Sequence, residues 1–193
     1  MRSDVAVLIL AGGEGKRIGG GKPLKRFRGE RLLDHALRRA RSWSDLVAIA
    51  VRDAAQVEPV EAALIKDHDV PGPLGGLLSG LEFARQNGRM FLLSIPADMP
   101  FLPSDLPDRL FGAIGDQTCA LAVSGGQLHP VCGLWRSSAL DQAGSYVADG
   151  RRSLKGFAER VGFAGVDWPA KPIDPFFNVN TNEDLAEAAR AAS

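Results

Sequence analysis

Cysteine is scarce in this chain of 193 residues, which has two copies, Cys119 and Cys132. Both lie in apolar stretches without a metal-ligand pattern around them, so we expect buried thiols in a reducing cytosol rather than a disulfide scaffold. The sequence also lacks a signal region before its first apolar run, and it lacks an apolar run of about 20 residues. We therefore expect a cytoplasmic protein that does not enter a membrane.

An excess of either charge is also absent. Lysine plus arginine and aspartate plus glutamate count 23 each, so no global basic field favours nucleic acid or an acidic membrane surface. A local basic patch for phosphates remains compatible with this balance. Hydrophobic residues make up 45% of the chain, an ordinary globular value. The length predicts one domain over residues 1–193.

Short apolar runs alternate with segments of helical spacing. Strands are predicted at residues 4–10, 46–51, 90–95, 118–123, 129–135 and 163–168. Helices are predicted at residues 31–42, 54–64, 75–86, 106–114, 138–147, 153–161 and 183–192, although Pro59 weakens the second of these. The alternation predicts an α/β fold with a mostly parallel central sheet and right-handed crossovers.

A glycine-rich loop directly follows the first predicted strand, with the sequence LAGGEGKRIGGGKPL at residues 10–24. Glycines let a backbone approach a ligand closely, and Arg17 and Lys22 add charge suited to a triphosphate. A P-loop is excluded because Lys16 replaces a required glycine and Pro23 follows Lys22. Neither register of the dinucleotide fingerprint supplies the third glycine, which disfavours a nicotinamide oxidoreductase.

The strand predicted at residues 90–95 runs into Pro96-Ala97-Asp98-Met99-Pro100. The flanking prolines fix the local backbone and are expected to hold Asp98 at the carboxyl edge of the sheet, near the glycine-rich loop. A carboxylate there suits Mg²⁺, which prefers oxygen ligands and bridges phosphates. The alternative is a helix cap or turn aspartate. Asp98 together with the loop cations favours the metal.

Three further histidine-containing segments have ordinary explanations. Asp67, His68 and Asp69 fit a solvated loop, and His35 lies on a predicted helix where a structural role is favoured. His129 precedes Pro130 and has no obvious Ser or Cys partner, so no nucleophilic triad is assigned.

The chain resembles the molybdenum cofactor guanylyltransferases, the MobA-type enzymes. The matching blocks are residues 10–24, PGPLGGLLSGL at 71–81, SIPADMPFLP at 94–103, HPVCGLW at 129–135 and FFNVNTNEDL at 176–185. The first block alone marks only the wider nucleotidyltransferase family, whereas the combination is specific. The resemblance implies a Rossmann-like layered fold with helices on both faces of the sheet. It also implies transfer of GMP from GTP to the terminal phosphate of molybdopterin, with Mg²⁺ bound and pyrophosphate released.

The resemblance also implies roles for individual residues. Leu10, Ala11, Gly12 and Gly13 would contact the guanine and phosphates. Lys22 would hold the phosphates, Asp67 would lie near the nucleotide, and Asp98 would bind Mg²⁺, with Arg17, Lys22 and Asp98 as the catalytic set. Two positions depart from the family pattern: Gly21 stands where an aspartate is usual in a loop one residue longer, and Ile49 stands where an asparagine is usual.

The acceptor site is expected at a cationic segment. Arg151, Arg152 and Lys155 lie between two predicted helices, with Ser153 as a helix N-cap, and a helix N-terminus with nearby arginines suits a phosphate. A solvated basic turn is the alternative. Asn178 and Asn180 are further acceptor candidates, while Asn182 or Thr181 caps the last helix.

Several functions remain open from the residues alone. They are cytidylyl transfer to the same cofactor, guanylyl transfer to another phosphorylated acceptor, and a catalytically silent nucleotide-binding module. The resemblance implies protein partners among other cofactor-biosynthesis proteins or molybdoenzyme chaperones.

Overall fold

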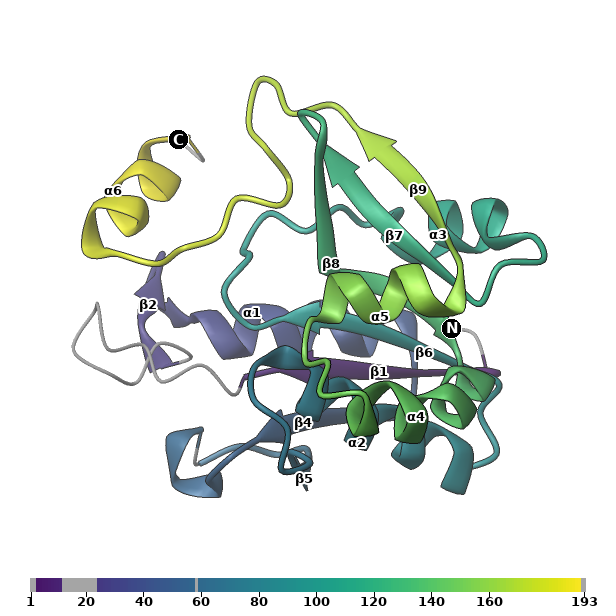
Figure 1. Ribbon diagram of the computed structural model, residues 1–193. Coiled ribbons are helices and arrows are strands. Elements are labelled where there is room, and N and C mark those ends of the chain that lie inside the picture. The colour runs from purple at the N-terminus through teal and green to yellow at the C-terminus, as the bar shows by residue number, and fades with distance from the viewer. Residues whose placement is uncertain (1–2, 12–23, 58, 192–193) are drawn as a thin grey trace.

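Seven strands form one sheet in the computed structural model, which describes residues 3–11, 24–57 and 59–191 (Figure 1). Their order is β5-β4-β1-β6-β8-β7-β9, and only β8 runs antiparallel to its neighbours. The strands are β1 (Val5–Leu10), β4 (Val47–Val51), β5 (Ala63–Lys66), β6 (Phe91–Pro96), β7 (Cys119–Ser124), β8 (Gln127–Arg136) and β9 (Phe163–Trp168). The predicted α/β fold with a mostly parallel sheet is confirmed.

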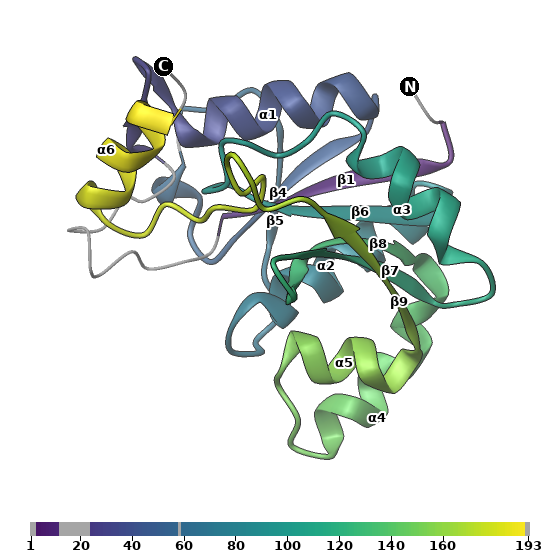
Figure 2. The same ribbon diagram turned by 90° about the horizontal axis from the view of Figure 1, so that it is seen from above.

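Helices cover both faces of this sheet (Figure 2). One face carries α1 (Leu32–Trp43) and α3 (Leu106–Ile114). The other carries α2 (Pro73–Gln86), α4 (Ala143–Ala148) and α5 (Leu154–Val161). The continuous apolar run of β1 follows from this arrangement, because Val7 and Ile9 pack toward α1 while Ala6 and Leu8 pack toward α2.

The end of the chain returns to the region before α1. Helix α6 (Asn182–Ala191) lies beside the short strands β2 (Arg26–Phe27) and β3 (Glu30–Arg31) in both ribbon views. Phe27, Leu32, Val179 and Ala188 form a small buried cluster between these segments. Thr181 caps α6, since its hydroxyl accepts the backbone N–H of Asp184 at 3.0 Å while the Asp184 carboxylate accepts the Thr181 N–H at 2.8 Å.

Two predicted helices are wrong in part. The segment predicted as a helix over 54–64 forms a 3₁₀ turn, η3 (Ala54–Gln56), and then strand β5. Pro59 cannot donate a helical hydrogen bond, and β5 gains the backbone pairing of β4 instead. The segment 138–147 begins as the 3₁₀ helix η4 (Ser137–Gln142) before α4. The β2–β3 hairpin was not predicted, because its strands of two residues are too short for a periodic pattern.

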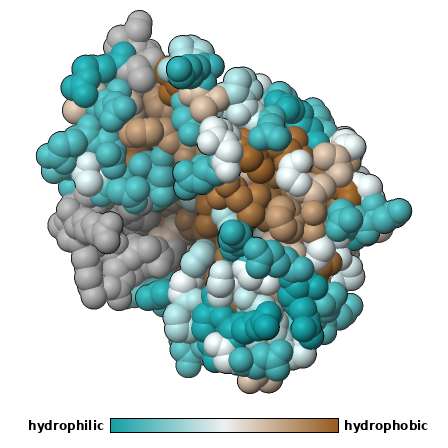
Figure 3. Space-filling model, turned by 45° about the horizontal axis from the view of Figure 1, so that its top comes forward, coloured by the Kyte–Doolittle hydropathy of each residue, from teal (hydrophilic) through white to brown (hydrophobic). Residues whose placement is uncertain are grey.

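Figure 3 shows hydrophobic residues gathered across the middle of this face, between hydrophilic residues on either side. Among the described residues, Met90 is the one large hydrophobic side chain that is exposed. Within the described ranges, no helix combines the length and the apolar character needed to cross a membrane.

Candidate nucleotide-binding site

The parallel strands place three side chains along one edge of the sheet, here called the carboxyl edge. The register pairs Leu10 with both Ala50 and Pro96. Beyond these positions the loops stay tied together, because Ala11 N–H donates to Ala50 O at 3.1 Å and Ala97 N–H donates to Leu10 O at 3.2 Å. Arg52, Asp67 and Asp98 each lie one or two residues past the end of a strand. Open α/β sheets bind ligands at such an edge.

A cavity of about 420 Å³ opens at the carboxyl edge. Asp67 and Asp98 line it from two strand ends, and Arg52 adds a cation. The cavity is lined by Leu10, Arg52, Asp67, Gly72, Pro73, Gly76, Pro96, Asp98, Val131 and Asn178. The cavity therefore combines apolar lining residues with a few polar groups, which is the composition typical of a small-molecule site.

Two glycines at the start of α2 allow this helix to pack closely against the loop before it and against Leu10. A Cβ on Gly76 would lie 2.8 Å from the Leu10 side chain and 3.2 Å from Asp67 Oδ1. A Cβ on Gly75 would lie 2.6 Å from the carbonyl oxygen of Val70. Ser79 then fastens the loop to the helix, since its hydroxyl accepts the His68 N–H at 2.9 Å and donates to Lys66 O at 2.8 Å. The glycines of the PGPLGG block thus bring α2 close to Leu10 and Asp67.

Asp67 is held in a site that disfavours its charge. Burial raises the pKa of its carboxyl, while the nearby charges of Arg52 and His68 oppose that shift. Its Oδ1 atom is buried and has no hydrogen-bond partner among the described residues. A buried carboxylate oxygen of this kind is costly unless a ligand or ion supplies the missing contact.

Asp98 lies in a turn that follows β6 rather than at a helix terminus. Helix α3 begins at Leu106 with Asp105 as its N-cap, which excludes a capping role for Asp98. Its backbone carbonyl accepts the Val179 N–H at 3.0 Å, so the turn is also tied to the returning end of the chain. The nearby Cys132 thiol has its pKa raised by burial and by the charge of Asp98.

Four of the residues expected at the site come together around this cavity: Leu10, Asp67, Asp98 and Asn178. Asn180 is exposed and does not line the cavity, although its side chain donates to Asn178 O at 3.3 Å. Ile49 is fully buried against the α1 face of the sheet, so this position takes no part in binding nucleotide.

The other site residues expected in the glycine-rich loop are Gly12, Gly13, Arg17 and Lys22, and they lie outside the described residues. Their roles therefore stay predictions.

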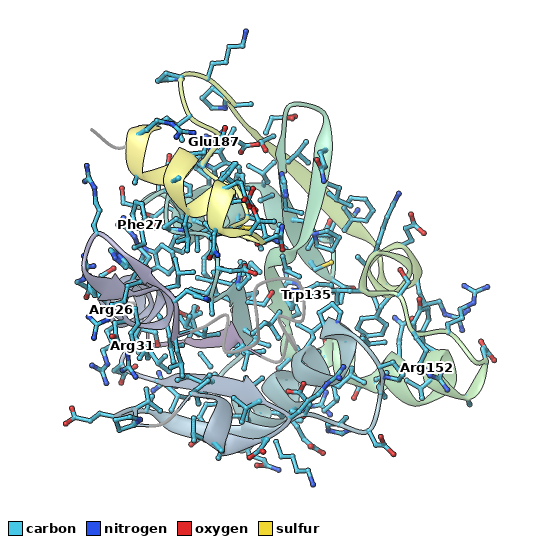
Figure 4. The ribbon with its side chains drawn as sticks, turned by 90° about the vertical axis from the view of Figure 1, so that its left-hand side faces the viewer. Arg26, Phe27, Arg31, Trp135, Arg152 and Glu187 are labelled. Carbon is cyan, nitrogen blue, oxygen red and sulfur yellow. The ribbon has the colours of Figure 1, made fainter. Side chains whose placement is uncertain are left out.

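The expected acceptor cluster does not reach the cavity. Arg151, Arg152 and Lys155 are exposed, and none of them is among the lining residues. Arg152 donates to Val147 O at 2.7 Å, and Lys155 lies 3.9 Å from Glu159. Figure 4 looks onto the carboxyl edge and shows Arg152 on the opposite side of the molecule from Arg26 and Arg31. The N-cap prediction is confirmed, since Ser153 accepts the Gly156 N–H at 3.2 Å.

The expectation that His129 lacks a serine partner is wrong. Its Nε2 lies 2.8 Å from the hydroxyl of Ser124, which is also within 2.9 Å of Asp174. Ser124 and His129 are five residues apart on either side of the β7–β8 turn, whereas Asp174 comes from the segment after β9. Gly125 and Gly126 form its turn with φ of 54° and 76°, as a two-residue hairpin loop requires. The interpretation of His35 as structural agrees with its contact to Phe27 O at 3.1 Å.

Arg52 and Val131 are among the lining residues that were not expected at the site from the sequence. Arg52 was detectable, because it directly follows a predicted strand. Val131 lies within the HPVCGLW block, but the alternation of an antiparallel strand does not show which of its residues faces the site.

Comparisons with known proteins agree on the family and on the fold. Residues 7–162 match the family model described as the MobA-like NTP transferase domain. A molybdenum cofactor guanylyltransferase from Rhodopseudomonas palustris is 42% identical over 96% of this chain and 92% of its own length.

Solved structures share the fold at low identity. The molybdopterin-guanine dinucleotide biosynthesis protein A of Archaeoglobus fulgidus superposes with a TM-score of 0.78 at 24% identity, covering 97% of this chain and 98% of its own. The 2-C-methyl-D-erythritol 4-phosphate cytidylyltransferase of Thermus thermophilus superposes with a TM-score of 0.71 at 18% identity, covering 98% of each chain.

Proposed function

The chain belongs to the MobA-like NTP transferase family, and from that premise we propose that it transfers GMP from GTP to the terminal phosphate of molybdenum-molybdopterin. The observation that carries the proposal is the cavity at the carboxyl edge, where Asp67 and Asp98 face a space suited to a nucleotide. The guanylyl specificity comes from the relatives' names, because the fold itself is shared with a cytidylyltransferase.

The two carboxylates fit Mg²⁺. They offer oxygen ligands from two strand ends, and Asp67 Oδ1 is buried without a protein partner in the described chain. Mg²⁺ commonly takes one or two carboxylates and completes its shell with substrate phosphates and water. We assign Asp98 as the protein ligand. The chemistry that the ion supplies when bound is neutralisation of phosphate charge and polarisation of the α-phosphate.

The chain's own residues then bind and orient the reactants. Leu10 to Gly13 contact the guanine and the phosphates, while Arg17 and Lys22 hold the triphosphate by charge-assisted hydrogen bonds. An oxygen of the acceptor phosphate attacks the α-phosphorus in line, a new P–O bond forms, and the bond to the β-phosphate breaks to release pyrophosphate. No general base is required, because the attacking phosphate is already anionic at neutral pH. Positioning and electrostatic stabilisation supply the rate enhancement.

The acceptor is proposed to approach from the half of the molecule that carries Arg151, Arg152 and Lys155, whose positive charge attracts its phosphate. The phosphate then reacts at the cavity, where Asn178 and Asn180 contact the acceptor beside the nucleotide. Asn178 supports this assignment, since it lines the cavity from the returning end of the chain. We place the reaction in the cytoplasm, where both buried cysteines remain thiols.

A thermal-shift panel of GTP, CTP, ATP and UTP with Mg²⁺ tests the nucleotide assignment, because only a bound nucleotide raises the melting temperature by mass action. We expect the largest shift with GTP. An equal or larger shift with CTP would replace the proposal by cytidylyl transfer to the same cofactor. Pyrophosphate release with molybdenum-molybdopterin then separates an enzyme from a silent nucleotide-binding module.

A further inference from the structure

Ser124, His129 and Asp174 form a polar cluster that the proposed reaction does not use, with Ser124 and His129 buried and Asp174 half-buried. Ser124 is 2% exposed and His129 is 8% exposed. The Ser124 hydroxyl lies 2.8 Å from His129 Nε2, and 2.9 and 3.0 Å from the two carboxylate oxygens of Asp174. The three side chains come from β7, from β8 and from the segment before α6.

The order of donors in this cluster differs from that of a nucleophilic triad. The carboxylate of Asp174 accepts, so the single proton of the Ser124 hydroxyl points to it. His129 must then donate its Nε2–H to the serine oxygen. In a nucleophilic triad the histidine instead accepts the serine proton. This geometry activates no nucleophile, and it fastens three chain segments together.

Asp174 begins a segment, residues 174–180, that we call the strap. Asp174 Oδ1 also accepts the Phe176 N–H at 2.9 Å, and the Phe176 ring stacks on His129 with centroids 4.9 Å apart. Farther along, Val179 N–H donates to Asp98 O at 3.0 Å. The strap is therefore fixed at one end by the polar cluster and at the other by the turn that carries Asp98. Asn178 lies directly before the second fixed point and lines the cavity.

We propose that Ser124, His129 and Asp174 are positioning residues that hold the strap so that Asn178 meets the acceptor at the cavity. The proposal rests on the proposed function for the identity of the acceptor. Asn178 is exposed and belongs to no helix or strand, so its place depends on how the strap's backbone is held. The cluster provides that restraint from β7 and β8.

Steady-state kinetics of Ser124→Ala test the proposal. We expect the KM for molybdenum-molybdopterin to rise roughly fivefold, while the affinity for GTP changes by less than about twofold. Ser44→Ala is the matched control, because Ser44 is equally buried and donates to Val5 O at 2.7 Å at the opposite edge of the sheet. Asp174→Asn should keep the acceptor KM near that of the unmodified enzyme, since the amide oxygen still accepts from Ser124 and Phe176. Asp174→Ala should raise it.

A double-mutant cycle separates positioning from general destabilisation. In an Asn178→Ala background, Ser124→Ala should have no further effect on the acceptor KM, because the side chain that the cluster positions is already absent. Additive effects would overturn the proposal. If Ser124→Ala does not fold, His129→Gln replaces it with the same expectation, because it removes the stacking on Phe176.

Hydrogen exchange provides a readout without turnover. Ser124→Ala should speed amide exchange at Val179 while leaving β1 and β6 protected. Unchanged exchange at Val179 would overturn the positioning role even if the enzyme used a different acceptor. Absence of acceptor-dependent pyrophosphate release from the unmodified enzyme would instead overturn the proposed function, so the two failures are distinguishable.

Discussion

The two halves of the sheet carry different kinds of polar residue. In the half formed by β5, β4, β1 and β6, polar side chains stand just beyond the strand ends and face a cavity. In the half formed by β8, β7 and β9, the buried polar side chains of Ser124 and His129 bond to protein groups. We propose from this difference that the nucleotide binds mainly against the first half and that the second half orients the acceptor. Changes in the first half should alter GTP binding and rate, and changes in the second should alter the acceptor KM.

Asp98→Asn should show the largest effect. The amide is a poorer Mg²⁺ ligand than the carboxylate, so we expect turnover to fall at least about a hundredfold while the melting temperature stays near that of the unmodified protein. Pyrophosphate release measured across a Mg²⁺ titration checks this. Normal rates at limiting Mg²⁺ would show that Asp98 has only a structural role in the turn after β6.

Lys22→Ala should weaken GTP binding and slow transfer. A charge-assisted phosphate contact contributes roughly 1.5–3 kcal/mol, which corresponds to a loss of about tenfold or more. Isothermal titration calorimetry with GTP measures the affinity. If both affinity and rate were unchanged, Lys22 would have no place in the site.

Gly76→Ala should lower GTP affinity roughly fivefold, because the new Cβ would press on Leu10 and Asp67 at the cavity wall. Gly112→Ala is the matched control, since a Cβ there meets nothing within 4 Å and Gly112 also lies in a helix. Calorimetry on both variants compares them directly. Equal GTP affinity in the two variants would place the nucleotide away from α2.

The double variant Arg151→Ala, Arg152→Ala should raise the acceptor KM severalfold and leave GTP affinity intact. The reason is loss of positive charge near the N-terminus of α5. Arg26→Ala is the control, because Arg26 is exposed on the opposite side of the molecule (Figure 4). An unchanged acceptor KM and rate would show that the acceptor binds elsewhere. The proposed division of roles between the two halves of the sheet would then be wrong.

The two cysteines should show the smallest effect. Burial raises the pKa of the Cys119 thiol to about 12 and raises that of Cys132 as well, so neither forms the reactive thiolate near neutral pH. Treatment of the folded protein with iodoacetamide at about pH 8 should leave it unlabelled and active. Unfolding in guanidinium should then expose both thiols to labelling. Rapid labelling of the folded protein would show that β7 and β8 open readily.

Much of the fold was predictable because its signals are local. The apolar run of β1, the helical spacing of α3 and the capping serine of α5 depend on neighbouring residues. The segment 54–64 shows the limit of such signals. Its apolar spacing suits a helix, yet its last part becomes β5 because β4 offers an unpaired edge. Pairing between distant segments decided the outcome there.

The candidate site divides in the same way. Asp98 was placed correctly because two prolines and a buried strand fix the end of β6. Arg52 was missed although it directly follows a predicted strand, whereas Val131 was missed because its place at the cavity depends on how separate strands lie side by side. The serine partner of His129 was missed for a similar reason. The hairpin turn at Gly125 and Gly126 determines which residue of β7 faces His129. Asp174, at the start of the strap, lies 45 positions after His129 in the chain.

The sequence by itself determined the class of fold, the family and the carboxylate at the end of β6, because each depends on residues that are close together in the chain. Only the tertiary structure decided which of these residues share a cavity and which are held apart from it. It joined Leu10, Asp67 and Asp98 through the parallel register, and it tied the strap to the β7–β8 hairpin through Ser124. Contacts of this kind depend on the packing of segments that are distant in sequence, and no local pattern records them.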